Sequence, residues 1–234
     1  MKNPLYLILL LFGLSLSAFG QTINHSAFTE FLQKQVTDKG AVNYKQIKAN
    51  DAELNAYLNQ FINISPKESW TTNETLAYWI NAYNAFTIKL IIDNYPVESI
   101  KDIKNPWDQE FIPINGKLLS LNYIEHDVLR NMNEPRIHFA IVCASASCPQ
   151  LLNEAFIPKK LDKQLTNATK QFLADSSKNR IQKENLELSK IFKWFSKDFK
   201  ENGSLIDFLN TYSDVKIPSD TKINYMDYSW KLND

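Results

Sequence analysis

The sequence has little of several residue types on which common function classes depend. Only 5 glycines occur in 234 residues, and neither G-x-G-x-x-G nor G-x-x-x-x-G-K is present, so a glycine-rich phosphate loop is not expected. Two cysteines and three histidines are too few for a disulfide scaffold or a four-cysteine zinc site. Lys plus Arg equals Asp plus Glu at 26 each, so no net charge attracts nucleic acid or anionic lipid.

Aromatic and aliphatic residues, in contrast, are plentiful. Hydrophobic residues make up 44% of the chain and charged residues 22%, which is typical of a globular protein and excludes wholesale disorder. The composition predicts no cofactor. It does not reveal a function.

The first 20 residues have the pattern of a secretory signal peptide. Lys2 precedes an apolar run over residues 5–16, and Ala18 and Gly20 place small residues before a cleavage site at Gln21. A membrane anchor is the alternative, but the run is shorter than the ~20 residues of a spanning helix. We therefore expect a periplasmic or extracellular protein of residues 21–234, with no transmembrane segment after cleavage, in a compartment that permits disulfides.

The remaining sequence predicts an α+β fold, mainly helical with short antiparallel strands and hairpins, in a single compact domain. Apolar spacing predicts helices, and turn signals such as Asn115-Gly116 predict hairpins. Helices are expected over 25–36, 51–62, 73–94, 121–132, 160–174, 192–199 and 204–212, and hairpins over 111–121 and 180–188. Strands are expected over 137–143 and 223–230, and a further helix from Ser147-Cys148-Pro149.

Asn81 and Asn84 lie three residues apart in the longest predicted helix, which is apolar on most sides. Side-chain amides in such a helix need hydrogen-bond partners. Either they bond the backbone of neighbouring loops, or they line a site and hold a substrate carbonyl.

Glu125 falls within the apolar arc of the helix predicted over 121–132, while His126 falls outside it. A carboxylate on a core face should be paired or neutralised. It forms a structural ion pair, for example with Arg136, or it orients a histidine. His126 is expected at the surface or rim, with a pocket-facing position as the alternative.

The densest chemical signal is the segment from His138 to Pro149, which holds both cysteines. Cys148 falls at the predicted helix start, where backbone N–H groups and the helix dipole favour a thiolate. His138, Ser147 and Cys143 accompany it. This pattern predicts a nucleophile with an adjacent oxyanion hole.

Three other interpretations of the same segment remain open. Cys143 alone is typical of a small buried hydrophobe. The two cysteines form a structural disulfide if the chain is exported. A metal site built from His138, His126, Cys148 and a carboxylate lacks any metal-motif spacing, and no metal is predicted.

Five segments together resemble the family called domain of unknown function 547. They span residues 78–86, 124–130, 136–151, 188–199 and 225–233, in the order of the family. The resemblance implies one domain over 65–234, preceded by an amino-terminal helical extension over 21–64. It implies no catalytic residue, because the family has no assigned activity.

Two function hypotheses follow. The first is an exported cysteine-dependent hydrolase or acyl transferase of amides or esters. Its catalytic set is Cys148 as nucleophile, His138 as base and Glu125 as orienting acid, with His126 and Cys143 as substitutes and Asn81, Asn84 and Ser147 binding substrate. The second is a non-catalytic module that binds a peptide or glycan, with a structural cysteine pair. A free thiol near a histidine favours the first, and an oxidised pair favours the second.

Overall fold

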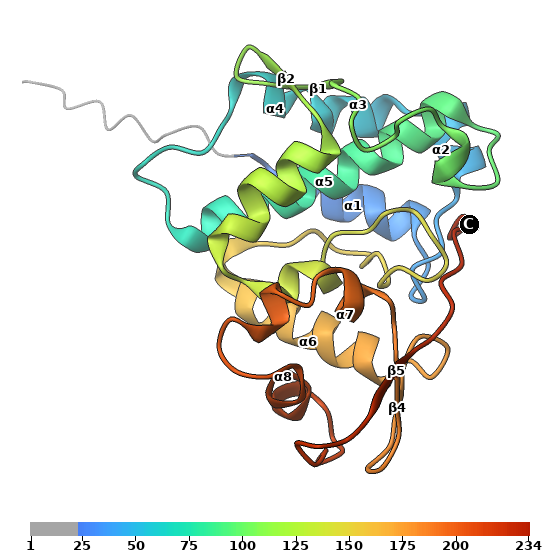
Figure 1. Ribbon diagram of the computed structural model, residues 1–234. Helices are drawn as coiled ribbons and strands as arrows, with labels where there is room; N and C mark the ends of the chain where they lie inside the picture. Colours follow the sequence, from blue (N-terminus) through green and yellow to red (C-terminus); the bar gives the residue numbers. More distant parts are fainter. Residues whose placement is uncertain (1–22) are drawn as a thin grey trace, which may run out of the picture.

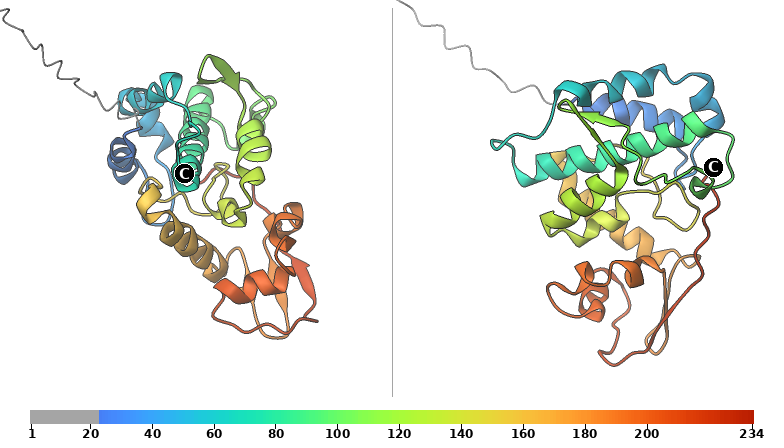
Figure 2. Two further views of the ribbon diagram at one scale, coloured as in Figure 1. Left: turned by 90° about the vertical axis from the view of Figure 1, so that its left-hand side faces the viewer. Right: turned by 45° about the horizontal axis from the view of Figure 1, so that its top comes forward.

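The structure is a computed structural model, and it describes residues 23–234 (Figure 1). The predicted signal peptide lies outside the described residues. At the centre is α5 (Thr72–Asn94), which begins at a capping box in which Thr71 and Glu74 satisfy each other's backbone N–H groups. Nearly every residue of α5 from Leu76 to Ile92 is buried, because other elements cover it on several sides (Figure 2).

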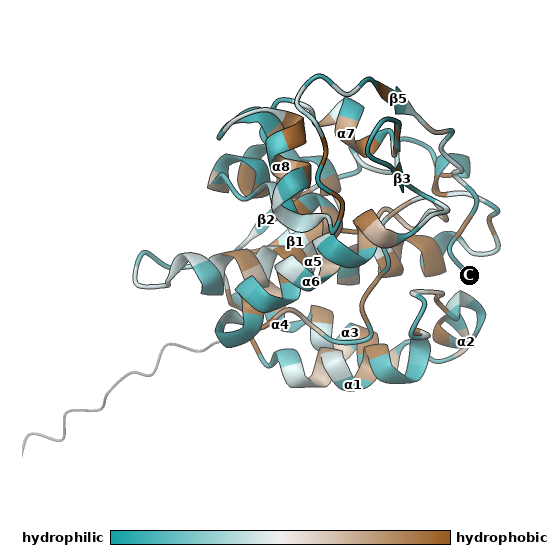
Figure 3. Ribbon diagram, turned by 90° about the horizontal axis from the view of Figure 1, so that it is seen from below, coloured by the Kyte–Doolittle hydropathy of each residue, from teal (hydrophilic) through white to brown (hydrophobic). Residues whose placement is uncertain are grey.

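Short amino-terminal helices cover one side of α5. They are α1 (His25–Gln35), α2 (Tyr44–Ala49), α3 (Ala52–Leu58) and α4 (Gln60–Asn63). Aromatic rings join these helices, for example Phe28 and Tyr57, which stack with centroids 4.5 Å apart. Figure 3 shows hydrophilic residues on the outward face of these helices, with hydrophobic residues turned toward the interior.

The segment after α5 passes through a 3-10 turn, η1 (Ile100–Asp102), to the hairpin of β1 (Ile112–Ile114) and β2 (Lys117–Leu119). Asn115 and Gly116 both have positive φ angles, 50° and 72°, as a type I′ turn requires. The predicted first hairpin is confirmed.

The helix expected over 121–132 is present, but most of it is a π-helix. η2 (Tyr123–Leu129) is followed by the 3-10 helix η3 (Arg130–Met132), and the Arg130 N–H bonds the carbonyl of Glu125 five residues earlier. η2 packs against α5 on the side opposite the amino-terminal helices (Figure 2). π-Helical turns are frequent at functional sites.

The carboxyl-terminal part builds a second hydrophobic cluster beside the one around α5. Its elements are η4 (Pro135–Phe139), η5 (Pro158–Lys160), α6 (Leu161–Ala174), β3 (Arg180–Ile181), β4 (Leu186–Leu188), α7 (Ile191–Trp194), η6 (Asp198–Lys200), α8 (Leu205–Tyr212) and β5 (Ile223–Tyr225). β4 pairs with β3 antiparallel and with β5 parallel. Phe139 inserts into this cluster, where it contacts Phe172, Phe192 and Phe199.

The chain end then returns to the amino-terminal helices (Figure 1). Isolated bridges join Ser145 to Leu232 and Ser99 to Lys231, and the Val42 N–H donates to the carbonyl of Asn233. The tail therefore links the beginning, middle and end of the described chain.

The mainly helical α+β fold is confirmed, but two predicted elements are wrong. Residues 137–143 do not form a strand: Pro135 begins the 3-10 helix η4, capped by Glu134. The backbone beyond it is satisfied by a side chain, Asn84, instead of a neighbouring strand. No helix begins at Pro149, because the preceding backbone pairs with the tail, where Ala146 N–H donates to the Lys231 carbonyl.

Among residues 23–234, no helix is both long enough and apolar enough to cross a bilayer. The boundary predicted near residue 65 stays a prediction, since the hydrophobic cluster around α5 also contains side chains from the amino-terminal helices.

Candidate functional site

A cavity of about 220 Å³ lies where α5, η2, α7, the 141–149 loop and the tail meet. Each of the five segments that resemble the family contributes at least one side chain to the wall of this cavity. The side chains on its wall are Tyr83, Trp107, Asn122, Glu125, His126, His138, Ile141, Cys143, Cys148, Pro149, Ile191, Trp194, Phe195, Tyr228 and Trp230.

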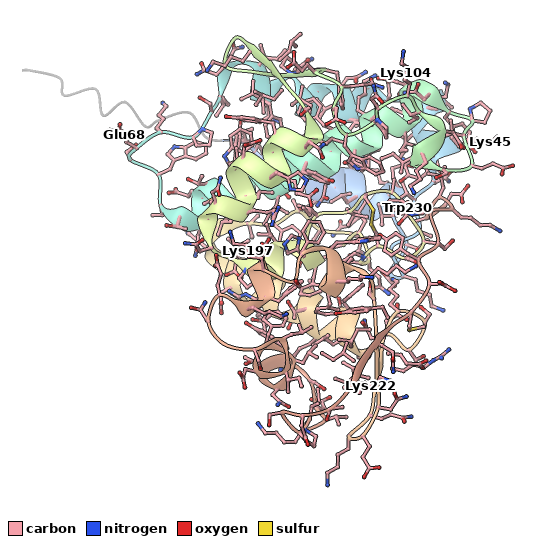
Figure 4. The ribbon with its side chains drawn as sticks, in the orientation of Figure 1. Lys45, Glu68, Lys104, Lys197, Lys222 and Trp230 are labelled. Atoms are coloured by element: carbon pink, nitrogen blue, oxygen red, sulfur yellow. A yellow bond between two sulfur atoms is a disulfide. The ribbon has the colours of Figure 1, made fainter. Side chains whose placement is uncertain are left out.

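One wall of the cavity is aromatic. Trp194 contacts Tyr228 and Trp230, with ring centroids 4.8 Å and 5.9 Å apart, and Trp107 lies 5.6 Å from Trp230. Figure 4 marks Trp230 on the carboxyl-terminal segment above β5. Lys101 lies over Trp230, 4.2 Å from the ring centroid, so the tail is held by a cation–π contact as well. These rings offer flat apolar surface next to polar groups.

Glu125 projects from η2 and is 8% exposed, as its place on the apolar arc predicts. The Tyr83 hydroxyl donates to its Oε2 atom at 3.1 Å. Burial raises the pKa of Glu125 from its ordinary value of 4.5 to about 7, against the opposing effects of Tyr83 and the charge of Arg130. A carboxyl that is partly protonated near neutral pH can both donate and accept a proton.

The ion pair expected between Glu125 and Arg136 is not formed. Arg136 instead binds Glu134 at 2.6 Å and Asp162 at 2.8 Å, and it also donates to the Thr166 hydroxyl. Glu125 therefore has no salt bridge among the described residues, which is why burial dominates its pKa.

The side chain of His138 is buried, and both its ring face and its Nε2 atom contact other side chains. Its ring stacks on Phe195 with centroids 4.0 Å apart, and its Nε2 atom lies 2.8 Å from Asp198 Oδ2. Burial lowers the pKa of His138, against the opposing hydrogen bond of Asp198. Although burial acts to raise it, hydrogen bonds from Arg130 and His138 hold the pKa of Asp198 well below its usual range.

His126 lies at the cavity rim and is exposed, so both of its predicted positions hold at once. Arg130 Nη1 lies 3.0 Å from its Nδ1 atom. Burial and then the charge of Arg130 lower the pKa of His126, so the ring is neutral at neutral pH.

Cys148 is not a free nucleophile, because Cys143 and Cys148 form a disulfide. Cys148 also does not begin a helix, and His138 bonds Asp198 instead of a thiol. The catalytic set of Cys148, His138 and Glu125 is therefore wrong in its nucleophile. The alternative in which the two cysteines join as a disulfide is confirmed.

Asn81 and Asn84 do not line the cavity; they hold the 140–157 loop. Asn84 donates to the Ala140 carbonyl at 2.8 Å and accepts from the Val142 N–H at 2.9 Å. Asn81 does the same for both backbone groups of Phe156, at 2.7 Å and 2.9 Å. Both amides imitate a neighbouring strand, so their backbone-binding interpretation is confirmed.

Ser147 is likewise structural in its contacts. Its hydroxyl accepts from the Ser229 N–H at 2.8 Å, and its own N–H bonds the Ser229 carbonyl. It therefore fixes the tail that carries Tyr228 and Trp230 against the loop. It is not on the cavity wall.

Sequence reasoning missed most of the aromatic wall and the partner of His138. No role at a site was assigned from the sequence to Tyr83, Trp107, Trp194, Tyr228 or Asp198. The available signal was compositional: three of the 5 tryptophans line this cavity. Their sequence positions are too far apart for any local pattern to join them.

Within residues 23–234, no group of three or more His, Cys, Asp or Glu side chains is arranged to hold a metal ion. The chemistry available on the cavity wall is therefore stacking on aromatic faces, hydrogen bonding by amide, imidazole and hydroxyl groups, and proton transfer at Glu125.

The comparisons with known proteins agree with the resemblance found above. A family model described as "Protein of unknown function, DUF547" matches residues 67–173, which include α5, η2, the disulfide loop and α6 but not the tail. No curated protein and no solved structure matches the chain. Residues 67–173 of this chain are thus a DUF547 domain, a member of a family of unknown function.

Proposed function

We propose that this chain is a binding protein that holds one ring of a neutral glycan in the cavity between η2, α7 and the tail. The observation that carries the proposal is the aromatic wall of Trp107, Trp194 and Trp230 facing a few polar groups. The faces of sugar rings carry C–H groups that pack on indole rings, while their hydroxyls need donors and acceptors. Ligand sites commonly combine an apolar wall with a few placed polar groups in this way.

The polar groups favour an uncharged ligand. Asn122, Glu125 and His126 supply an amide, a carboxyl and a neutral imidazole. No Lys or Arg side chain lines the cavity wall among the described residues, so the wall itself offers no cation to pair with a carboxylate or phosphate. A peptide that binds by adding a strand to a sheet needs a free strand edge, and no strand lies on this wall in the described chain.

The proposal places the protein in the periplasm or outside the cell. The amino-terminal pattern of residues 1–20 motivates this placement, and the Cys143–Cys148 disulfide supports it, since disulfides persist in oxidising compartments. The partner is then a soluble or surface glycan; a nucleic acid is not expected.

A second candidate is hydrolysis of an amide or ester, with Glu125 acting on a water molecule. The observation in its favour is the pKa of about 7 for a buried carboxyl on a cavity wall. Cleavage of a glycosidic bond by the usual carboxyl pair is less well supported, because Glu125 is the sole carboxyl on this wall in the described part of the chain.

Tryptophan fluorescence during titration with neutral mono- and oligosaccharides tests the binding proposal. Trp194 is 45% exposed, so Trp194→Ala should fold. It removes one of the three indole rings on the cavity wall, and binding should weaken by about thirtyfold, which corresponds to ~2 kcal/mol for truncating an aromatic contact. Trp70→Phe is the matched control, because Trp70 packs on the α5 cluster away from the cavity. Binding of short peptides with no response to any sugar would overturn the proposal.

The same titrations separate the second candidate. Product formed from a chromogenic ester or amide by the wild type, and lost in Glu125→Gln, would favour hydrolysis. Sugar binding that survives Glu125→Gln, with no product in either protein, would favour a binding module.

A further inference from the structure

The disulfide is part of the cavity wall, and its two sulfurs are not equivalent. Cys148 is 4% exposed, whereas Cys143 is only partly buried and packs at the edge of the hydrophobic cluster. Both residues line the cavity. A small molecule in the cavity therefore reaches Cys143 more easily than Cys148.

The buried sulfur accepts two hydrogen bonds. The Cys143 N–H donates to Cys148 Sγ at 3.1 Å, and the Tyr228 hydroxyl donates to the same atom at 3.2 Å. The Tyr228 oxygen lies farther from Cys143 Sγ, at 3.4 Å, and the Ser145 oxygen lies 3.5 Å from it. Ser145 in turn donates to the Tyr228 oxygen at 3.1 Å, which orients that hydroxyl. Donors aimed at a sulfur stabilise its thiolate more than they stabilise the neutral disulfide, since a charged acceptor forms the stronger bond.

The disulfide closes a short loop, with a sequence separation of 5. In the chain-entropy account, a loop this short contributes about 2 kcal/mol to stability, at the lower end for disulfides. Stabilisation by itself also does not require a position on a cavity wall or a backbone N–H and a hydroxyl that both donate to the more buried sulfur. These features match the requirements of a leaving thiolate.

We propose that Cys143–Cys148 is an exchangeable disulfide, and that this chain carries out thiol–disulfide exchange with a thiol-bearing ligand that enters the cavity. The ligand thiolate attacks Cys143 Sγ and forms a new S–S bond to it. The Cys143–Cys148 bond breaks, and its electron pair goes to Cys148 Sγ, which leaves as a thiolate held by the Cys143 N–H and Tyr228. This activity goes beyond glycan binding and does not depend on it.

The complete reaction balances with two ligand thiols. A second ligand thiolate attacks the ligand sulfur of the mixed disulfide, releasing the ligand disulfide and the Cys143 thiolate. Two ligand thiols are oxidised, the protein disulfide is reduced to two thiols, and the two ligand protons end on the protein sulfurs.

The test uses the whole chain with reduced glutathione, without denaturant, followed by acid quenching and peptide mass analysis. In Cys148→Ser the free Cys143 thiol should instead be treated with oxidised glutathione: it should take up one glutathione and release one reduced glutathione, and the mixed disulfide should persist because no second protein thiol displaces it. In a protein that keeps both cysteines, Tyr228→Phe should slow reduction of the disulfide by reduced glutathione about fivefold to tenfold. This is the effect of one hydrogen bond of ordinary strength. Tyr225→Phe is the control, since Tyr225 is exposed and lies off the cavity wall.

Two results would overturn the proposal. One is reduction that proceeds only at the rate of global unfolding, measured on the wild type at low urea, since the disulfide would then be closed to ligands in the folded protein. The other is equal slowing by Tyr228→Phe and Tyr225→Phe. If Cys148→Ser does not fold, the wild-type rates and the two tyrosine variants still decide the question.

Discussion

Two buried polar regions of this molecule differ in how their polar groups are satisfied. On α5, Asn81 and Asn84 use both ends of their amides on loop backbone, and neither side chain lines the cavity. On the cavity wall, Glu125 has one neutral hydrogen-bond partner within residues 23–234, Tyr83, and its pKa is raised. Burial of a polar side chain therefore does not mark a functional site; incomplete satisfaction beside a cavity does.

The largest expected loss of stability comes from removing one of the two amides on α5 that bind loop backbone. Asn84→Ala leaves the Ala140 carbonyl and the Val142 N–H buried without partners. At roughly 1–3 kcal/mol for each unsatisfied group, unfolding free energy should fall by about 2–6 kcal/mol. Urea denaturation measures the change. A loss below about 1 kcal/mol would show that water replaces the amide and that the loop does not depend on it.

A second prediction concerns Gly40, which packs against Gln150 and Leu151 of the 140–157 loop. Gly40 has a φ of 81°, and a Cβ there would lie 3.0 Å from Gln150 Cα and Leu151 N. Left-handed backbone and overpacking together should make Gly40→Ala cost about 2–5 kcal/mol. Gly116→Ala is the matched control: φ is 72°, but nothing lies within 4 Å, so only the conformational cost of about 1–2 kcal/mol applies. Equal melting temperatures for the two variants would contradict this packing.

A third prediction is that the free energy of unfolding depends on pH through Glu125 on the cavity wall. The folded pKa of Glu125 is raised from 4.5 to about 7, so the folded state binds the extra proton between these values. Its favourable contribution is complete below pH 4.5 and is lost as pH rises through about 7, a change of about 3 kcal/mol. Glu125→Gln should remove this pH dependence and be more stable than the wild type above pH 7. Parallel stability curves of the two proteins from pH 4.5 to 8 would refute it.

The smallest expected effect is at Thr87, which lies on α5 one turn from Asn84. Its hydroxyl oxygen is buried and has no hydrogen-bond partner in the part of the chain that the structure describes. Thr87→Val keeps the shape and removes the unsatisfied group, so stability should stay within about 0.5 kcal/mol or rise. A clear loss in calorimetry would reveal a partner that the side chain holds in solution, and would weaken the contrast with Asn84.

Local patterns predicted the elements whose stability is local. The apolar spacing of α5 and the Asn115-Gly116 turn need no distant partner, and both are present. The burial of Glu125 was also predicted, although η2 is a π-helix, since its apolar residues still face α5. The strand predicted over residues 137–143 is wrong, because an apolar run is common to strands and to other buried segments.

Site assembly depended on contacts between distant residues. His138 bonds Asp198 across a sequence separation of 60, and Tyr228 reaches Cys148 across 80. A helix was expected at Cys148 because Pro149 fits a first turn, but pairing of that backbone with the tail satisfied the same groups at lower cost.

The sequence by itself determined the helical α+β class, the long central helix, the hairpins and the two cysteines as a chemically distinct pair. These follow from periodicity, turn residues and composition, which act within a few residues. Only the tertiary structure decided that the cysteines join, that Asn81 and Asn84 bind loop backbone, and that three tryptophans meet Glu125 around one cavity. Those outcomes depend on which distant groups satisfy a buried polar atom, and that choice is made when the whole chain packs.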